Sequence, residues 1–364
     1  MLAREEKARR KHRWRGDAPA AAPHAGAMKL VADGALSEIL DLKSGGSIED
    51  ILQSALLDPV ADLTSNPGKR LRGKLVHLAY RLANQGMPLS VADARRCKAC
   101  AEVLELVHAG SLVVDDIEDG SDVRRGLPAL HVRYGLSIAL NAGNWLYFWP
   151  LELIRSLELP DETLLAIYQQ YHRTLLRAHF GQAIDLGSRV DAQPQQRVPQ
   201  ICLAAMELKT GALVGLATFL GAALAKAPKG IRSALTEFGQ GIGVALQMFD
   251  DLGNVLGIKQ LEKRYEDLLL SRPSWAWACA ANTSSAEGYQ QFVSAVGQLP
   301  DARALESWIE RHSLVWTMRE GALQQLEGAF DGLTRALESQ PVRWCGRTLE
   351  ELRILGEEIS RAYG

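Results

Sequence analysis

The chain has 364 residues, of which 47% are hydrophobic and 23% are charged, so it is long enough to bury a substantial core. The 41 basic and 43 acidic residues nearly balance, and no overall field favours nucleic acid as a partner. No apolar run reaches the roughly 18 residues that a membrane span needs. Five scattered cysteines form no disulfide framework, which favours a reducing compartment. We therefore expect a cytoplasmic protein with no nucleic-acid partner and no membrane span.

The N-terminal residues differ in composition from the rest of the chain. Residues 1–27 are basic and then rich in alanine and proline, with no apolar stretch long enough for a secretory signal. We expect a disordered tail there, and Met28 is an alternative start of the natural chain. From Ala35 onward nearly every segment has helical periodicity, and strand signals are scarce. The sequence therefore predicts an all-α protein, with one all-helical domain over residues 28–364.

An apolar helical run ends in an acidic cluster made of Asp115, Asp116 and Asp119. In a helix these carboxylates lie three and four residues apart, so they crowd onto one face and repel one another. Mg²⁺ suits such a cluster, because it binds carboxylates together with the phosphate oxygens of a substrate. Arg124 and Arg125 follow directly, and an arginine fork matches phosphate geometry. The cluster predicts a diphosphate site, and the alternative is a solvated acidic helix end before a basic loop.

A second segment repeats this design. Residues 238–254 form an apolar helical run that ends in Asp250 and Asp251, with Asn254 four residues after the first aspartate. Two apolar helices that each end in paired aspartates can face one another across a cavity and share a metal cluster. The repetition favours the metal and diphosphate interpretation over a solvated helix end.

Six segments resemble, in order, the motifs of the polyprenyl synthetase family, the trans-isoprenyl diphosphate synthases. The two aspartate-rich motifs match best, except that Asn254 replaces the final aspartate of the second. The matches span residues 66 to about 275, and they are DDIED (115–119), RRGLPALH (124–131), QMFDDLGN (247–254), GKRLR (68–72), GQAIDL (181–186) and KT (209–210). Asp267 also falls where the family has an aspartate.

The resemblance implies a fold, a reaction and a metal. It implies a large helical bundle of the isoprenoid synthase type, with a central active-site cavity, and a homodimer. The reaction joins isopentenyl diphosphate to an allylic prenyl diphosphate through ionisation, condensation and elimination, with three Mg²⁺ ions. By the resemblance, Asp115, Asp119 and Asp250 coordinate Mg²⁺ directly, and Asp116 and Asp251 support them.

The resemblance also assigns the groups that hold the two substrates. Isopentenyl diphosphate would be bound by Lys69, Arg72, His108 and Arg125. The allylic diphosphate would be bound by Arg124, Lys209 and Lys263, and the allylic cation would be stabilised by Lys209, Thr210 and Gln247. The sequence itself supports the phosphate-binding role of Lys209. This lysine lies within an apolar helix, where its charge needs a partner, and a phosphate would serve.

Product length depends, by the resemblance, on what closes the cavity beneath the first motif. Gly110 and Ser111 stand one helical turn before Asp115, where short-chain members that resemble this chain often place an aromatic residue. Small residues leave room beyond fifteen carbons. The four aromatic residues at 145–149, which we expect to pack together, could plug the same space from the next helix. We expect geranylgeranyl diphosphate as the product.

Departures from the family pattern keep two other functions open. Val114 stands where the family commonly has histidine, and Arg272 stands where it has a lysine that closes over the active site. A class I terpene synthase, which cyclises a finished prenyl diphosphate, would need the same metal cluster and would use an aromatic-lined cavity. A non-catalytic regulatory subunit of a prenyl synthase would show degenerate aspartate motifs. The chain retains the residues that the resemblance assigns to a second diphosphate, isopentenyl diphosphate. Their presence favours a condensing enzyme over a terpene synthase.

Overall fold

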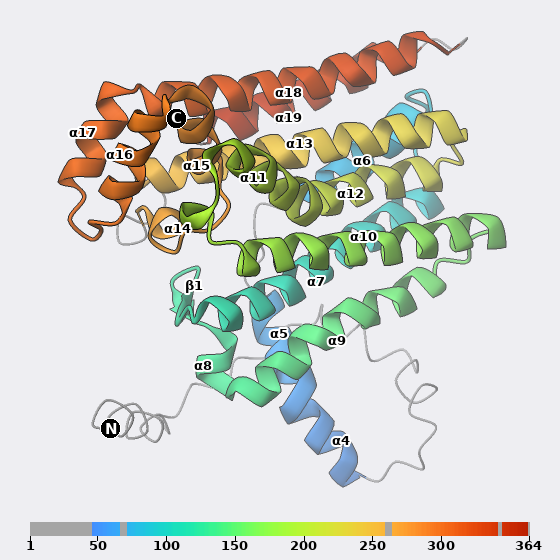
Figure 1. Ribbon diagram of the computed structural model, residues 1–364. Coiled ribbons are helices and arrows are strands. Elements are labelled where there is room, and N and C mark those ends of the chain that lie inside the picture. Colours follow the sequence, from blue (N-terminus) through green and yellow to red (C-terminus); the bar gives the residue numbers. More distant parts are fainter. Residues whose placement is uncertain (1–45, 66–70, 259–263, 341–343, 363–364) are drawn as a thin grey trace. The chain divides into compact units, whose positions relative to one another are not determined.

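The computed structural model describes residues 46–65, 71–258, 264–340 and 344–362 (Figure 1). Apart from two strands of two residues each, the regular elements of this part of the chain are helices. The predicted all-α class is therefore confirmed. The predicted tail over residues 1–27, Lys69 and Lys263 lie outside the described residues.

The chain divides into two compact units, and the boundary falls twice within a helix. The first unit contains the residues up to Pro67 together with Val113–Gly143, and the second contains Gly68–Leu112 together with Asn144–Gly364. The prediction of one domain over residues 28–364 stays a prediction.

The elements in chain order are α4 (Gly46–Leu52), η1 (Gln53–Leu57), α5 (Asp58–Thr64), α6 (Leu71–Ala83), α7 (Val91–Asp119), β1 (Val123–Arg124), β2 (Leu127–Pro128), α8 (Leu130–Tyr134), α9 (Leu136–Arg155), α10 (Asp161–Gly187), η2 (Val190–Ala192), η3 (Gln195–Arg197), α11 (Val198–Met206), η4 (Glu207–Gly211), α12 (Ala212–Leu224), α13 (Lys229–Leu256), α14 (Glu266–Leu269), α15 (Trp275–Thr283), α16 (Ala286–Val296), α17 (Arg303–Arg311), α18 (Leu314–Glu338) and α19 (Gly346–Arg361).

In the first unit, α5 and α8 are joined through one carboxylate. Asp62 of α5 accepts a hydrogen bond of 2.6 Å from the Arg133 guanidinium and another from the Tyr134 hydroxyl. Strands β1 and β2 form an antiparallel hairpin that follows directly on the acidic end of α7. The sequence analysis did not predict this hairpin. It gives the segment after the first acidic motif a defined backbone.

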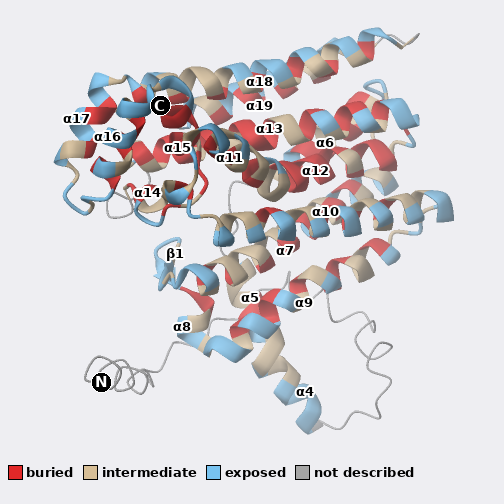
Figure 2. Cartoon of the chain, in the orientation of Figure 1, coloured by how far each residue is buried: buried red, intermediate tan, exposed pale blue. Residues whose placement is uncertain are grey.

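The second unit is built around α12 and α13. Figure 1 shows α18, α13, α12 and α10 side by side, and α13 packs against α12 and α18 while α12 also packs against α6. Every residue of α12 except Phe219 is buried, as Figure 2 shows by its colour. A helix that is apolar all round requires such a central position.

Glycines let α12 approach its neighbours at backbone distance. A Cβ at Gly221 would lie 2.3 Å from the Val76 carbonyl oxygen of α6. Towards α13, a Cβ at Gly239 would lie 2.3 Å from the Thr218 hydroxyl oxygen, and one at Gly243 would lie 2.8 Å from the Cα of Gly211. Any larger side chain at these crossings forces the helices apart.

A single helical stretch contains α11, η4 and α12, and its middle is a π-helical turn. Residues Gln195–Leu224 are long and apolar enough to cross a membrane by length and composition. Of the apolar window in this stretch, 61% is buried inside the protein, as expected for the core helix of a globular fold. The predicted absence of a membrane span stays a prediction.

All five cysteines lie in the described residues and are free thiols, as expected from their scattered positions. The four inside helices are buried and act as small apolar core residues. The chain therefore depends on no disulfide for its fold.

Candidate active site

The first acidic motif occupies the last turn of α7, in the first unit. Asp116 is 3% exposed, and the Arg124 Nε donates a hydrogen bond of 2.8 Å to its Oδ1. The same guanidinium lies 3.7 Å from the carboxylate of Asp115, which is half-buried. Carboxylates at a helix C-terminus face the negative end of the helix dipole, so a cation beside them is stabilising. Arg124 supplies that charge, and Asp119 is exposed at the helix end.

Arg125 lies at the tip of the hairpin that follows. Its φ is 52° and that of Gly126 is 79°, so both central residues of the two-residue turn have positive φ. This is the pattern of a type I′ turn, which fits the twist of a two-stranded hairpin. Arg124 and Arg125, adjacent in sequence, are thus separated in role: the first pairs with the acidic motif and the second is exposed.

The second acidic motif lies on α13, in the second unit. Asp251 is 5% exposed and accepts two hydrogen bonds, one of 2.8 Å from the Gln247 amide and one of 2.6 Å from the Trp275 backbone N–H. Burial, and then the charge of Asp267, raise the pKa of the Asp251 carboxyl above its ordinary value. Asp250 is half-buried beside it. The two aspartates of this motif therefore differ in environment.

Lys209 and Thr210 lie in the π-helical turn η4. The Lys209 ammonium forms an ion pair of 3.0 Å with Asp185 of α10, and the Thr210 hydroxyl donates a hydrogen bond of 2.8 Å to the Gln247 side-chain oxygen. A Cβ at Gly181 would lie 2.6 Å from the Lys209 backbone nitrogen, so α10 approaches this turn at backbone distance. Single π-helical turns inside α-helices often mark functional sites.

Asp267 is surrounded by the charges of several other acidic residues. Burial, and then the charges of Asp250, Asp185 and Glu266, raise the pKa of the Asp267 carboxyl to about 7, while Lys209 acts in the opposite direction. Crowded carboxylates that repel one another are the donor set that a hard divalent cation stabilises. Their carboxylate oxygens are the donor chemistry that Mg²⁺ prefers, and whether they bind the ion stays a prediction. Sequence reasoning gave no role to Asp185 or Asp267, although both stand in segments that match the family.

The raised pKa of Asp267 predicts a pH-dependent gain from removing its charge. The folded state binds this proton more tightly than the unfolded chain, so stability falls as pH rises from about 4 to 7. Asp267→Asn in EDTA should therefore raise the Tm at pH 8, by roughly 1–3 °C for each kcal/mol regained, and raise it less at pH 4. Thermal unfolding at both pH values checks this.

The control for this experiment has the opposite sign. Hydrogen bonds from Arg303 lower the pKa of the exposed Asp301 carboxyl. Asp301→Asn should therefore lose stability at pH 8 relative to pH 3. Equal Tm changes for Asp267→Asn at pH 4 and pH 8 would contradict the charge repulsion inferred at Asp267.

The remaining predicted residues of the second unit lie on α6, on α7 and in the segment between α14 and α15. Arg72 is the second described residue of α6, His108 is half-buried on α7, and Gly110 is buried two residues later. The Ser111 hydroxyl donates a hydrogen bond of 2.8 Å to the His108 carbonyl oxygen. Arg272 donates one of 3.0 Å to the Asp185 carbonyl oxygen, so this departure from the family pattern lies beside the partner of Lys209.

The expectation of one aromatic cluster on α9 is wrong in part. Trp145 and Trp149 stack, with ring centroids 4.9 Å apart, and Tyr147 packs edge-on against His179. Phe148 is 67% exposed and does not join them. On a helix, neighbouring positions point in directions about 100° apart, so four aromatic residues within five positions cannot share one face.

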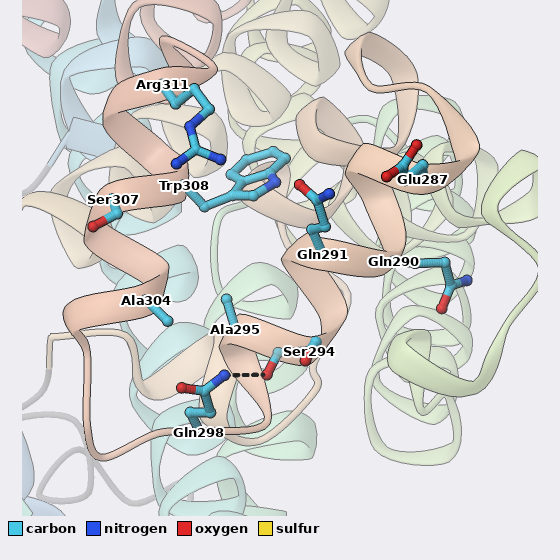
Figure 3. A pocket seen from close by; sticks show the side chains of 10 residues that line it. All are labelled: Glu287, Gln290, Gln291, Ser294, Ala295, Gln298, Ala304, Ser307, Trp308 and Arg311. Carbon is cyan, nitrogen blue, oxygen red and sulfur yellow. Dashed lines mark hydrogen bonds between the residues drawn. The ribbon is translucent and has the colours of Figure 1, made fainter.

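A groove between α16 and α17 contains none of the predicted site residues (Figure 3). Its volume is about 550 Å³, and it is lined by amide and hydroxyl side chains, two alanines, Glu287, Trp308 and Arg311. The Trp308 indole N–H is already bound, donating to the Gly288 carbonyl oxygen at 3.0 Å. Over the described ranges, no three His, Cys, Asp or Glu side chains are gathered to hold a metal. The predicted magnesium site stays a prediction.

Comparison with known proteins identifies the family. The polyprenyl synthetase family matches residues 53–310, which include both acidic motifs and the π-helical turn. The chain belongs to the polyprenyl synthetase family. This confirms the resemblance on which the predicted site residues were chosen, and the roles of those residues remain predictions.

Individual relatives agree with this assignment. The geranylgeranyl diphosphate synthase of Sulfolobus acidocaldarius is 30% identical over 228 residues, which cover 60% of this chain and 64% of that protein. A terpene synthase of Matsumurasca onukii is 35% identical over 136 residues, covering 37% and 41%. The chain thus spans less than two thirds of the length of the curated relatives it matches.

A solved structure shows the fold. The geranylgeranyl pyrophosphate synthase of Corynebacterium glutamicum, complexed with isoprenyl diphosphate and magnesium, has a TM-score of 0.69 at 20% identity. The similarity covers 92% of this chain and 96% of that one. The predicted helical-bundle fold of the isoprenoid synthase type is therefore confirmed.

Proposed function

We propose that this protein is a Mg²⁺-dependent prenyltransferase, which condenses isopentenyl diphosphate with an allylic diphosphate to give a linear prenyl diphosphate, geranylgeranyl diphosphate above all. The observation that supports it most is the group of carboxylates around Asp267, with the Lys209 ammonium among them, in a member of the polyprenyl synthetase family. Acidic groups for a cation and a lysine for a phosphate are what a metal-bound diphosphate needs. The protein would act as a cytoplasmic homodimer.

Each acidic motif would supply carboxylates to bound metal. Asp115, Asp119 and Asp250 would bind Mg²⁺, and the ion would supply Lewis-acid stabilisation of the departing diphosphate. Asp116 is held by Arg124, and Asp251 is held by Gln247 and the Trp275 N–H, so both would support their neighbours and not bind the ion directly.

The cationic residues would bind and orient the two diphosphates. Lys209, together with Arg124 and Lys263, would hold the allylic diphosphate. Lys209 pairs with the Asp185 carboxylate, and Arg272 donates a hydrogen bond to the Asp185 carbonyl oxygen. Arg72, His108, Arg125 and Lys69 would hold isopentenyl diphosphate. Placing both substrates fixes the double bond of one against the reacting carbon of the other, which lowers the entropic part of the barrier.

The reaction proceeds through a carbocation, which the chain would stabilise with dipoles. The allylic C–O bond breaks as negative charge moves to the diphosphate, and the double bond of isopentenyl diphosphate attacks the cation. The released pyrophosphate takes the proton that completes the step. Thr210 and Gln247, joined by a hydrogen bond of 2.8 Å, would direct their dipoles at the cation.

A product assay tests this proposal. Purified protein is incubated with Mg²⁺, isopentenyl diphosphate and dimethylallyl, geranyl or farnesyl diphosphate in turn, and products are read by mass spectrometry before and after phosphatase. Consumption of isopentenyl diphosphate with a longer linear prenyl alcohol supports the proposal. A hydrocarbon or cyclic alcohol from a prenyl diphosphate alone would identify a terpene cyclase. No turnover by the purified protein alone would favour a regulatory subunit.

Product length should depend on Ser111. Its side chain is half-buried one helical turn before Asp115, beside the buried Gly110. Ser111→Phe adds a ring where the growing chain would extend, so the product distribution should shift to farnesyl diphosphate or shorter. Mass spectrometry of the alcohols measures the distribution, and the Tm of the variant shows whether it is folded. An unchanged chain length in a folded variant would show that the floor lies elsewhere.

A further inference from the structure

A continuous line of hydrogen bonds connects three helical segments of the second unit. The Thr210 hydroxyl in η4 donates to the Gln247 Oε1 at 2.8 Å, and the Gln247 Nε2 donates to the Asp251 Oδ1 at 2.8 Å, both on α13. The Trp275 backbone N–H, at the start of α15, donates to the Asp251 Oδ2 at 2.6 Å. We refer to Thr210, Gln247, Asp251 and Trp275 as the relay.

Two members of the relay are sequence neighbours of residues in the acidic region. Thr210 follows Lys209, whose ammonium is bound by Asp185, and Asp251 follows Asp250, whose charge acts on Asp267. Its far end is fixed, because the Trp275 indole N–H donates to the Met318 carbonyl oxygen at 2.8 Å and a Cβ at Gly321 would meet that ring at 2.4 Å. The Trp275 end of the relay is therefore held against α18.

The donor and acceptor groups of these four residues determine which way each hydrogen bond of the relay points. A backbone N–H only donates, so one oxygen of Asp251 is an acceptor for Trp275. The Gln247 Nε2 donates to the other oxygen of Asp251, so the amide of Gln247 turns its NH₂ group to Asp251. The Gln247 oxygen then faces Thr210, whose hydroxyl donates its proton to it. Lone pairs of the threonine and glutamine oxygens remain for another partner.

We propose that Asp251 is a positioning residue, which fixes the direction of the relay so that Thr210 and Gln247 present oxygen lone pairs, and not N–H groups, to the allylic cation. This inference rests on the proposed function, because the cation is an intermediate of that reaction. It gives Asp251 a role through hydrogen bonding, separate from the metal binding assigned to Asp250. A dipole pointing the wrong way would repel the charge that it should stabilise.

Asp251→Asn tests the direction with little change in shape. The new side chain still accepts from Trp275 with its oxygen, but its NH₂ group now donates to Gln247, whose amide must rotate and present NH₂ to Thr210. We expect kcat to fall about 100-fold, the loss typical of one misdirected transition-state group. The KM of both substrates and the Mg²⁺ concentration for half-maximal activity should stay within a factor of two.

The double variant Asp251→Asn with Gln247→Glu should restore the acceptor for the Thr210 hydroxyl, and with it part of the activity. The introduced asparagine amide then donates to one oxygen of the introduced glutamate, whose second oxygen again accepts from the Thr210 hydroxyl. The total charge of the pair is unchanged. We expect kcat at least tenfold above that of Asp251→Asn alone. Unchanged kcat in Asp251→Asn would overturn the inference, because it would show that the wild-type side chain already donates. A raised Mg²⁺ requirement, or no rescue, would also overturn it.

A second measurement separates this inference from the proposed function. In protein labelled with ¹⁵N-glutamine, the side-chain amide signals of Gln247 are identified by their loss in Gln247→Glu. They should shift in Asp251→Asn, because the NH₂ group leaves a carboxylate, and unchanged signals would overturn the inference. Wild-type protein that fails to consume isopentenyl diphosphate contradicts the proposed function, whereas the amide signals report the relay in either case.

Discussion

Asp115→Ala is expected to abolish Mg²⁺-dependent turnover, with kcat/KM lower by about a thousandfold or more, while the protein stays folded. The loss follows from removal of a carboxylate that would hold the ion against the departing diphosphate, an interaction that contributes several kcal/mol. Folding should survive, because Asp115 is half-buried and Arg124 keeps its hydrogen bonds to the buried Asp116. Initial rates over a Mg²⁺ series, with far-ultraviolet circular dichroism, measure both parts.

The matched control is Glu102→Ala, which removes an exposed carboxylate from the same helix α7. Its activity and its Mg²⁺ dependence should equal those of the wild type. Normal turnover by a folded Asp115→Ala protein would show that the first acidic motif does not bind the catalytic metal.

Gly221→Val is expected to destabilise the fold by about 3 kcal/mol or more, because it forces apart two helices in backbone contact. A Cβ at this position would lie 2.3 Å from the Val76 carbonyl oxygen and 2.7 Å from the Tyr80 nitrogen. Neither atom can rotate away, since both belong to the backbone of α6. Thermal unfolding followed by circular dichroism should show a Tm lower by roughly 5 °C or more.

Gly230→Val provides the comparison for Gly221→Val. It makes the same substitution in the first turn of α13, where the residue is exposed and a Cβ would meet nothing within 4 Å. A β-branched residue is the better helix former of the two, so the Tm should change little or rise slightly. Equal losses at both positions would contradict the clash inferred at the crossing of α6 and α12, because a Cβ at Gly230 meets no neighbouring atom.

Local patterns in the sequence predicted the helices and the acidic motifs. Helical periodicity from Ala35 onward predicted the all-α class, and the spacing of Asp115, Asp116 and Asp119 placed them together at a helix end. The family resemblance, later confirmed, supplied the list of candidate residues. The hairpin after α7 was missed, because its two-residue strands are too short to show alternation and its turn depends on positive φ at Arg125.

Local periodicity and charge spacing determined which helices form and which of their ends are acidic, because these depend on neighbours three or four residues away. Only the tertiary structure decided which polar groups meet. The Lys209 and Asp185 pair joins residues 24 apart, and the Trp275 N–H reaches Asp251 over the same separation. Such contacts depend on how closely helices cross, and here glycines such as Gly181 permit backbone contact. A single sequence contains the glycines but not the partners they bring together.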